Sequence, residues 1–331
     1  MSLVRPTSLS ASARGLLAGL KGKSLLRIDN YSPAEFKAVL EFSHVIKGKV
    51  KAKQLNRVLE GESLSMIFQK RSTRTRVSTE TGCGLLGAQA LFLSTEDVQL
   101  GVNESLKDSS VVLSRYNSIL LARVFGHDTV QQMAEFATVP VINALSASHH
   151  PLQSLADYMT LQEHFGNDLS KLELSWVGDG NNVCADLMLG GTMLGLNVRV
   201  ATPPGEHQPE IQIVDAARSL AAITGGRLNL FHDPVEAVYN ANVVVTDTWV
   251  SMGQEAQKAA RLSTFRNYKV TRQLCASAHK DWVFLHCLPR HPEEVEDEVF
   301  YSNRSLVFDE AENRMYTVMA VMCAMLGKLD V

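Results

Sequence analysis

Short apolar runs rich in β-branched residues alternate along this chain with longer segments of helical periodicity. Such alternation is typical of strand–helix–strand units, which build parallel sheets. The predicted strands occupy residues 63–69, 90–93, 119–125, 139–145, 172–178, 197–203, 242–249, 282–289 and 305–308. The sequence therefore predicts an α/β fold.

The chain has 331 residues, which is more than one hydrophobic core usually supports. The predicted strands also fall into two sets, with a boundary near residue 150, and the segment that spans it, HHPLQSLADYMTLQEHF, has helical periodicity. We therefore expect two domains, each a parallel sheet flanked by helices, joined by long helices. A methionine stripe in the last helical segment, residues 314–329, is expected to pack in a core and not to bind a cofactor.

Composition excludes several classes of protein. The 45% of hydrophobic and 20% of charged residues are those of an ordinary globular protein, and a formal net charge of -3 disfavours a nucleic-acid partner. No apolar run approaches the roughly 20 residues needed to cross a bilayer, so no membrane partner is expected. The five cysteines are widely spaced and form no C-x-x-C pair, which favours a reducing compartment.

The first 23 residues contain two arginines and several serines but no acidic residue. This composition resembles the end of a mitochondrial transit peptide, although a disordered polar leader has the same composition. The mitochondrial matrix is the expected compartment, and the cytoplasm is the alternative.

Strongly polar segments lie at the carboxyl ends of the predicted strands, which is the edge where open parallel sheets bind ligands. In chain order these segments are KRSTRTR, ARV, HHPLQ, GDGNN, DTWVSMG and HCLPR. The coincidence predicts an active site.

The segment KRSTRTR places four cations within seven residues, directly behind the apolar run LSMIF. A helix that begins there offers backbone N–H groups and the positive end of its dipole to an anion. The hydroxyls of Ser72, Thr73 and Thr75 add donors, and Arg74 adds a guanidinium fork suited to phosphate. We interpret the segment as a phosphate site; the alternative is a solvated basic face.

The segment GDGNN suggests a dinucleotide site, but it lacks the third glycine of that fingerprint and the acidic residue that binds the ribose. Asn181 and Asn182 can still bind a polar ligand, or one of them can simply cap a helix.

The segments DTWVSMG and HCLPR each carry a reactive or charged group. Asp247 can hold an ammonium group, or it can cap the next helix. Cys287 follows His286, but adjacent residues of a strand point to opposite faces, so a cysteine–histidine nucleophile is disfavoured.

Taken together, the motifs resemble those of the aspartate/ornithine carbamoyltransferase superfamily, and most closely its ornithine carbamoyltransferase family. The match runs from about residue 24 to residue 327 and includes STRTR, ARV, HPLQ, DTWVSMGQ and HCLPR in order, with GDGNN and FDEAENR besides. The resemblance implies transfer of the carbamoyl group from carbamoyl phosphate to the δ-amine of L-ornithine, giving L-citrulline and phosphate. This is a step of arginine biosynthesis and the urea cycle, and it needs no metal and no organic cofactor.

The resemblance also implies roles for individual residues. The residues implied to bind carbamoyl phosphate are Ser72, Thr73, Arg74, Thr75, Gln89, Arg123, His150, Gln153, Cys287, Leu288 and Arg314. Those implied to bind ornithine are Asn182, Asp247, Ser251 and Met252, and those implied in catalysis are Arg74, Arg123, His150 and Cys287.

By the same resemblance, residues 1–150 form the carbamoyl phosphate domain, on which the helix at 312–331 packs, and residues 151–311 form the ornithine domain. A homotrimer is expected, with Gln89 donated to the site of a neighbouring subunit. Two alternatives stay open: another acceptor, such as putrescine or an acetylated ornithine, and a catalytically silent anion-binding protein on the same scaffold.

Overall fold

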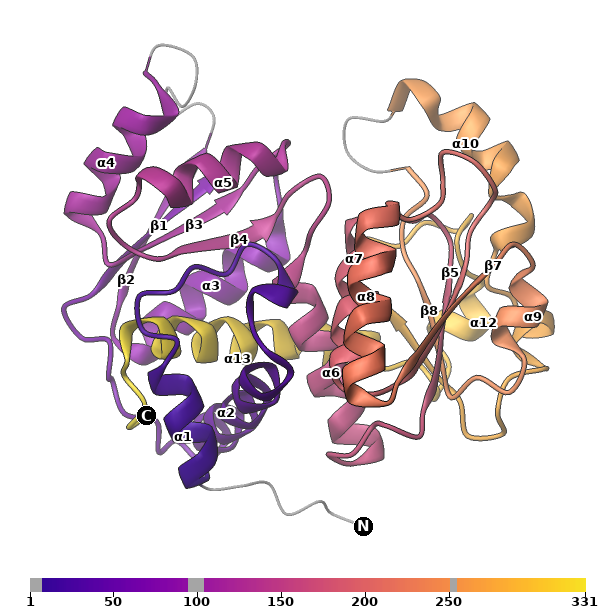
Figure 1. Cartoon of the computed structure of the whole chain (residues 1–331), viewed down its shortest axis with the longest axis horizontal. Coiled ribbons are helices and arrows are strands. Elements are labelled where there is room, and N and C mark those ends of the chain that lie inside the picture. The colour runs from indigo at the N-terminus through magenta and orange to yellow at the C-terminus, as the bar shows by residue number, and fades with distance from the viewer. Residues whose placement is uncertain (1–7, 95–103, 251–254) are drawn as a thin grey trace. The chain divides into compact units, whose positions relative to one another are not determined.

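The structure is a computed structural model that describes residues 8–94, 104–250 and 255–331. The chain forms two compact units, Met1–Met159 with Glu312–Val331, and Thr160–Ala311. It crosses the boundary within two long helices, α6 (Pro151–Phe165) and α13 (Val307–Leu326). Each unit contains a parallel sheet flanked by helices, so the predicted α/β class and the joining helices are confirmed (Figure 1).

The first unit is built on a four-stranded parallel sheet in the order β2-β1-β3-β4. Its strands are β1 (Ser63–Phe68), β2 (Gln89–Ser94), β3 (Ile119–Arg123) and β4 (Val141–Leu145). The central strands β1 and β3 are almost entirely buried, whereas the edge strand β2 is partly exposed. This matches the near-continuous apolar runs from which the strands were predicted.

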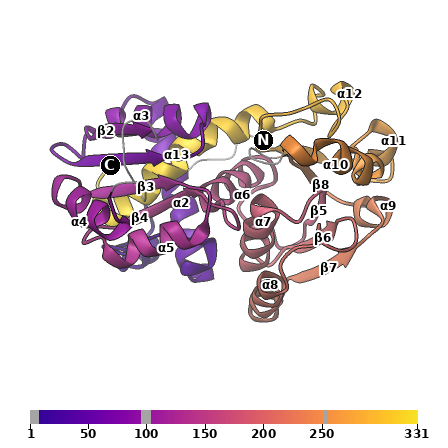
Figure 2. The ribbon, with the colours of Figure 1, turned by 90° about the horizontal axis from the view of Figure 1, so that it is seen from above.

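Helices cover both faces of this sheet. They are α1 (Ala11–Ala18), α2 (Pro33–Lys51), α3 (Thr73–Leu86), α4 (Leu106–Tyr116) and α5 (His127–Phe136), with a short 3-10 turn at Ile28–Asn30. In Figure 2 the sheet lies between α3 and α13 on one side and α4 and α5 on the other. Val130 and Met133 of α5 pack on Leu120 and Ala122 of β3, which fixes the face that α5 covers.

The second unit is built on a five-stranded parallel sheet in the order β7-β6-β5-β8-β9. Its strands are β5 (Glu173–Val177), β6 (Asn197–Ala201), β7 (Arg227–Phe231), β8 (Val243–Thr246) and β9 (Val283–His286). Its helices are α7 (Asn182–Met193), α8 (Ile211–Thr224), α9 (Pro234–Val238), α10 (Lys258–Thr264), α11 (Arg272–Cys275) and α12 (Asp297–Phe300), with 3-10 turns at Glu255–Gln257 and Arg266–Tyr268.

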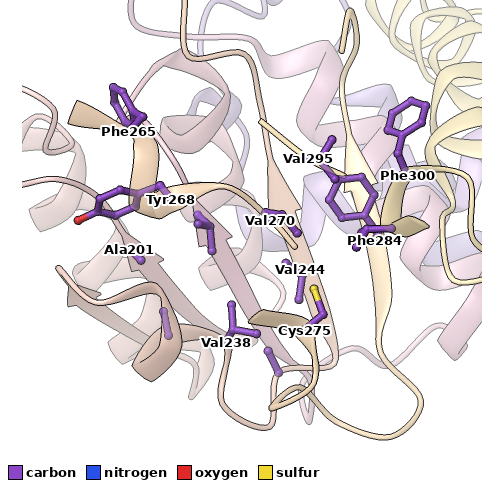
Figure 3. Close-up of a cluster of buried hydrophobic side chains, with 14 of the residues drawn as sticks. Ala201, Val238, Val244, Phe265, Tyr268, Val270, Cys275, Phe284, Val295 and Phe300 are labelled. Carbon is purple, nitrogen blue, oxygen red and sulfur yellow. The ribbon is translucent and has the colours of Figure 1, made fainter. Parts of the chain in front are cut away.

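One face of the second sheet carries a hydrophobic cluster in which Val244 of β8 and Phe284 of β9 meet Val238 of α9 and Phe300 of α12 (Figure 3). Trp249 and Phe265 belong to the same cluster and are stacked, with their ring centroids 5.7 Å apart. This core therefore supports the loop that leaves β8.

Two strand assignments differ from the structure. The strand predicted at 305–308 is wrong, because Ser305 makes only an isolated bridge to Phe284 and α13 begins at Val307. Strand β7 was missed, although its alternation of polar and apolar residues (RLNLF) after the Gly225–Gly226 turn is the sequence pattern of a strand.

The leader-like segment is folded in its second half. Ser10 caps α1 by accepting a hydrogen bond from the Ala13 N–H, and Leu17 and Leu20 are fully buried. From Ser10 onward the segment therefore belongs to the first unit and is not a disordered leader. Among the helices of the described residues, none combines the length and apolar character needed to span a membrane.

Candidate functional site

The strand order of each sheet reverses at one point, and polar motifs flank both points. In the first sheet the reversal falls between β1 and β3, and in the second it falls between β5 and β8. Open α/β sheets bind ligands at such points, outside the carboxyl ends of the strands. In the first sheet, KRSTRTR follows β1 and Arg123 ends β3. In the second sheet, GDGNN follows β5 and Asp247 follows β8. Each unit therefore carries a candidate half-site.

In the first unit the phosphate motif forms the start of α3. Ser72 is the N-cap, and its hydroxyl accepts a hydrogen bond from the Thr75 N–H at 3.3 Å. The first turn contains Thr73 and Arg74 and no acidic residue. Backbone donors, hydroxyls and a guanidinium therefore gather at the positive end of a helix, as predicted for an anion site.

Three further polar residues surround this helix start. Arg123 ends β3 directly opposite Phe68, the last residue of β1, so it neighbours the loop that leads to α3. Arg314 of α13 donates hydrogen bonds to the Gln153 side-chain oxygen at 2.6 Å and to the Thr75 hydroxyl at 3.3 Å. The structure thus brings together residues that lie 239 positions apart in the chain.

His150 belongs to the same half-site and is buried. Burial lowers the pKa of His150 well below its usual value, and the guanidinium groups of Arg314, Arg123 and Arg74 lower it further. The imidazole is therefore neutral near pH 7, so that it can donate one N–H hydrogen bond without adding a charge.

The remaining cations of KRSTRTR have different surroundings. Arg76 donates to Glu80 at 3.0 Å, and its guanidinium lies 3.7 Å from the centroid of the Phe92 ring. Lys70 lies over the Phe125 ring at 5.0 Å, and burial together with the nearby Arg123 lowers its pKa. Arg76 is therefore engaged in local packing, whereas Lys70 contributes to the field around Arg123.

The different surroundings of Arg74 and Arg76 predict a large loss of activity for one of two matched variants and almost none for the other. If the start of α3 binds the phosphate of carbamoyl phosphate, as the resemblance implies, Arg74→Gln should lower kcat/KM for that substrate about 100-fold, because a charge-assisted hydrogen bond is worth roughly 1.5–3 kcal/mol. Arg76→Gln should change it less than threefold. Steady-state kinetics with carbamoyl phosphate as the varied substrate compares the two, and equal losses would contradict the assignment.

The turn that carries His150 is held by a buried hydrogen-bond network. Asn143, in the middle of β4, donates from its amide to the Leu26 carbonyl at 2.8 Å and to the Ser146 hydroxyl at 3.1 Å. Ser146 contacts His127 Nδ1 at 2.8 Å, and its N–H donates to the His149 carbonyl at 2.9 Å. The network fixes the residues just before His150.

His127 makes this network sensitive to pH. Burial, with smaller contributions from His149 and Arg27, lowers the pKa of His127 to about 4. An unfolded chain binds the proton near pH 6.5, so stability is full above that pH and falls as the pH drops toward 4. When the pH falls from 7 to 5, we expect the free energy of unfolding of His127→Gln to decrease by about 1 kcal/mol less than that of the wild type, which is about 2–4 °C in Tm. The expected difference is no larger because the His127 side chain is only partly buried. Thermal melts across this range test it, and parallel Tm curves for the two proteins would contradict it.

In the second unit the central group is Asp247, which follows β8 and is buried. Its Oδ2 accepts a hydrogen bond from the Asn181 amide at 2.8 Å, and its Oδ1 accepts one from the Cys287 thiol at 2.9 Å. Three loops, those after β5, β8 and β9, therefore meet at one carboxylate. A carboxylate at this position suits an ammonium group.

The GDGNN turn contacts this carboxylate through Asn181. Asn181 caps α7 by accepting from the Val183 and Cys184 N–H groups, while its amide reaches Asp247. At Gly180 a Cβ atom would lie 2.4 Å from the backbone nitrogen of Pro209, so this glycine is required by the packing of its own chain. Of the two roles that the sequence left open for Asn181, it therefore fills the cap, and it also contacts the half-site carboxylate.

A buried ion pair holds the same turn. Arg261 of α10 pairs with Asp179 and also donates from Nε to the Trp249 carbonyl, while His207 lies 3.4 Å from Asp179. Burial raises the pKa of Asp179, and Arg261 opposes that shift. Arg261 therefore ties the loop after β8 to the loop after β5; its position in the sequence gave no signal of this.

The neighbouring side chains His286 and Cys287 of the HCLPR segment have different hydrogen-bond partners. His286 contacts Glu294 through Nε2 at 3.2 Å, whereas Cys287 faces Asp247. Arg290 bonds to the Val295 carbonyl and to Asp297, so it serves the local structure.

The potential metal ligands Asp247, His286 and Cys287 lie within 4.8 Å of one another, the one such group of at least three that the described part of the chain contains. Both ring nitrogens of His286 are already engaged, Nε2 with Glu294 and Nδ1 with the Leu288 N–H. The expectation that no metal is needed stays a prediction.

Some predicted site residues lie elsewhere. Gln89 pairs with Ser63 at the amino end of β1, about 16 Å from the carboxyl edge where Thr73 begins α3. It therefore cannot join the half-site of its own chain. Ser251 and Met252 lie outside the described residues. Asn182 is the first residue of α7, beside Asn181.

Two family models match the chain along almost its entire length. Residues 23–163 match the model described as aspartate/ornithine carbamoyltransferase, carbamoyl-P binding domain. Residues 170–325 match the model described as aspartate/ornithine carbamoyltransferase, Asp/Orn binding domain.

Relatives from distant organisms are similar over the same length. The mitochondrial ornithine transcarbamylase of Gallus gallus is 51% identical over 93% of this chain and 86% of its own. The ornithine carbamoyltransferase of Pyrococcus horikoshii is 46% identical over 94% of this chain and 98% of its own. The solved ornithine carbamoyltransferase of Pyrococcus furiosus matches with a TM-score of 0.90 and 46% identity, covering 93% of this chain and 98% of that one.

Proposed function

Because the chain belongs to the aspartate/ornithine carbamoyltransferase family, we propose that it transfers the carbamoyl group of carbamoyl phosphate to the δ-amine of L-ornithine, giving L-citrulline and phosphate. The observation that supports this proposal most strongly is the chemical contrast between the two half-sites. The first joins arginines, hydroxyls and a neutral histidine at a helix start, which suits an acyl phosphate. The second centres on a buried carboxylate, which suits an ammonium group.

Carbamoyl phosphate binds at the start of α3, in this proposal. Ser72, Thr73 and Thr75 and the N–H groups of the first turn bind the phosphate, together with Arg74. Arg314 is already bonded to Gln153 and to Thr75, so these three residues present a fixed arrangement to the same substrate. Arg123 and His150 bind the carbamoyl carbonyl oxygen.

Catalysis follows from orientation and electrostatics. The neutral δ-amine attacks the carbonyl carbon, a C–N bond forms, and negative charge develops on the carbonyl oxygen. Arg123 and the N–H of neutral His150 stabilise that charge. The bond between the carbonyl carbon and the phosphate oxygen then breaks, phosphate leaves with the electron pair, and the amine proton passes to the phosphate.

Ornithine is the acceptor that the second half-site favours. Asp247 receives the α-ammonium group, with Asn182 beside it, and Cys287 and Leu288 lie near the reacting amine. Aspartate is disfavoured as the acceptor, because a second carboxylate at Asp247 would be repelled. Putrescine and acetylated ornithine lack the free α-ammonium and carboxylate pair of ornithine.

One assay tests the reaction and the acceptor together. Phosphate release from carbamoyl phosphate is measured with ornithine, putrescine, acetylornithine and aspartate, and the carbamoylated products are identified by mass spectrometry. We expect release with ornithine and formation of citrulline. Release of phosphate with another amine would identify that amine as the acceptor. Binding of carbamoyl phosphate without turnover would favour the silent anion-binding protein.

The assembly and compartment are part of the proposal. We propose a homotrimer with shared sites, in which Gln89 serves a neighbouring subunit; its position at the amino edge of the sheet leaves it no role in its own chain. Light scattering should give about three chains. We propose the mitochondrial matrix, since the Gallus gallus relative is named as mitochondrial, whereas the Pyrococcus horikoshii relative is named without a compartment.

A further inference from the structure

The carboxylate of Glu294 joins the loops that leave β8 and β9, although no motif of the sequence includes it. The residue is 2% exposed. Its Oε1 accepts a hydrogen bond from the Trp249 N–H at 3.3 Å, and its Oε2 accepts one from His286 Nε2 at 3.2 Å. Trp249 lies two residues after Asp247, and His286 directly precedes Cys287. One side chain therefore contacts both segments of the ornithine half-site.

Glu294 is held firmly by the core. The Val270 N–H donates to the Glu294 carbonyl at 2.9 Å, and Val270 pairs with Val295 in a parallel bridge. Both valines are fully buried in the hydrophobic cluster of Figure 3. The N–H of His291 also donates to Glu294 Oε2 at 2.9 Å. The carboxylate is thus presented from a rigid part of the unit.

The negative charge of Glu294 is retained despite its burial. Burial by itself raises the pKa of Glu294, but hydrogen bonds from His286 and His291 outweigh it and hold the pKa below its usual value. The carboxylate is therefore ionised near pH 7 and accepts hydrogen bonds on both oxygens.

Through His286, Glu294 supports the backbone beside Cys287. The imidazole is fully buried, and its Nδ1 accepts a hydrogen bond from the Leu288 N–H at 2.9 Å. Nε2 must then carry the proton that faces Glu294, so the carboxylate selects the tautomer that holds Leu288. Leu288 has φ +62°, a strained conformation that a non-glycine residue keeps only where its surroundings impose it.

Through Trp249, Glu294 supports the backbone beside Asp247. The Trp249 N–H is bonded to Glu294, and the Trp249 carbonyl accepts from Arg261. Both polar groups of this residue's main chain are therefore fixed, which limits the motion of the segment that carries Asp247.

We propose that Glu294 is a positioning residue for the acceptor amine: it aligns Asp247 through Trp249, and Cys287 and Leu288 through His286. The inference rests on the proposed function, because it concerns the geometry in which ornithine is bound. A carboxylate is required, since an amide has one acceptor oxygen. In Glu294→Gln the NH₂ group faces either the Trp249 N–H or the His286 N–H, so one of the two loops loses its hydrogen bond.

The test compares Glu294→Gln with Glu298→Gln, an exposed glutamate of α12 that undergoes the same change of charge. We expect Glu294→Gln to raise the ornithine KM at least tenfold, with the KM for carbamoyl phosphate within twofold of wild type and Glu298→Gln unchanged. Glu294→Asp, which keeps the charge on a shorter side chain, should recover part of the loss.

A second readout does not need activity. Cys287 is partly exposed and the other four cysteines are buried, so its alkylation by iodoacetamide can be followed by mass spectrometry. Its rate should change at least threefold in Glu294→Gln, because its contact with Asp247 at 2.9 Å depends on both loops. This holds even if the variant is only marginally stable, since the experiment can be run well below its Tm.

The outcomes separate the two proposals. If the wild type forms no citrulline, the proposed function fails, whatever the alkylation rates show. If the wild type is active and Glu294→Gln keeps the wild-type ornithine KM and alkylation rate, the positioning role is wrong. Equal increases in both KM values, with a lower Tm, would also overturn it, because they indicate a merely structural residue.

Discussion

Replacing Arg123 with alanine is expected to lower citrulline formation about a thousandfold while the chain stays folded. Arg123 is 7% exposed at the carboxyl end of β3, and its charge lowers the pKa of His150. In the proposed mechanism it faces the carbonyl oxygen on which negative charge develops. Losing one donor of that kind costs about 10²- to 10³-fold in turnover. Rates at saturating ornithine and carbamoyl phosphate provide the measurement.

Two comparisons make this result specific. Arg115→Ala removes an exposed arginine from the last turn of α4 and should leave turnover unchanged. The fold should survive in Arg123→Ala, because the Arg123 carbonyl, which accepts from the Gln69 N–H, belongs to the main chain. Near-normal citrulline formation by a folded Arg123→Ala protein would refute the mechanism.

The second large effect concerns Asp247→Asn. The substitution preserves the shape of the side chain but removes the charge that the α-ammonium group of ornithine needs. We expect kcat/KM for ornithine to fall roughly 100-fold, since a buried charge-assisted hydrogen bond is worth about 1.5–3 kcal/mol. Binding of carbamoyl phosphate, measured by calorimetry, should be retained because the residues proposed to bind its phosphate and its carbonyl oxygen belong to the first unit.

The chain offers a matched control for this substitution. Asp233 follows β7 as Asp247 follows β8, but it is exposed and simply caps α9 by accepting from the Val235 N–H. Asn caps helices as well as Asp does, so Asp233→Asn should leave the kinetics unchanged. If both variants behave alike, Asp247 is also only a cap, which was the open alternative for this residue.

The sequence predicted the architecture well where its patterns are local. The buried strands β1, β3, β5 and β9 read as apolar runs because parallel strands are covered on both faces. The edge strand β7 was not predicted, since three of its five residues are exposed and it contains no continuous apolar run. The apolar composition of residues 305–308 predicts a strand. The prediction is wrong because a short apolar run looks the same in a strand and at the start of a helix.

The site was predicted to the extent that its residues sit at strand ends. Serine, threonine and arginine after β1 identify an anion site by their chemistry, and Asp247 after β8 was recognised as a candidate partner for an ammonium group. By composition alone, Lys70, Arg74 and Arg76 are equally good candidates for binding a phosphate. Their surroundings distinguish them, because Arg76 lies over Phe92 while Arg74 acts on His150.

By itself, the sequence determined the α/β class, the two-domain division and the chemical types of the site residues. It did so because hydrophobic periodicity and the motifs at strand ends each involve residues that are close together in the chain. Only the tertiary structure decided which distant groups meet. Arg314 reaches Thr75 across 239 positions, and Glu294 connects Trp249 with His286. Such contacts depend on strand order and helix packing, which bring together residues whose separation along the chain carries no periodic signal.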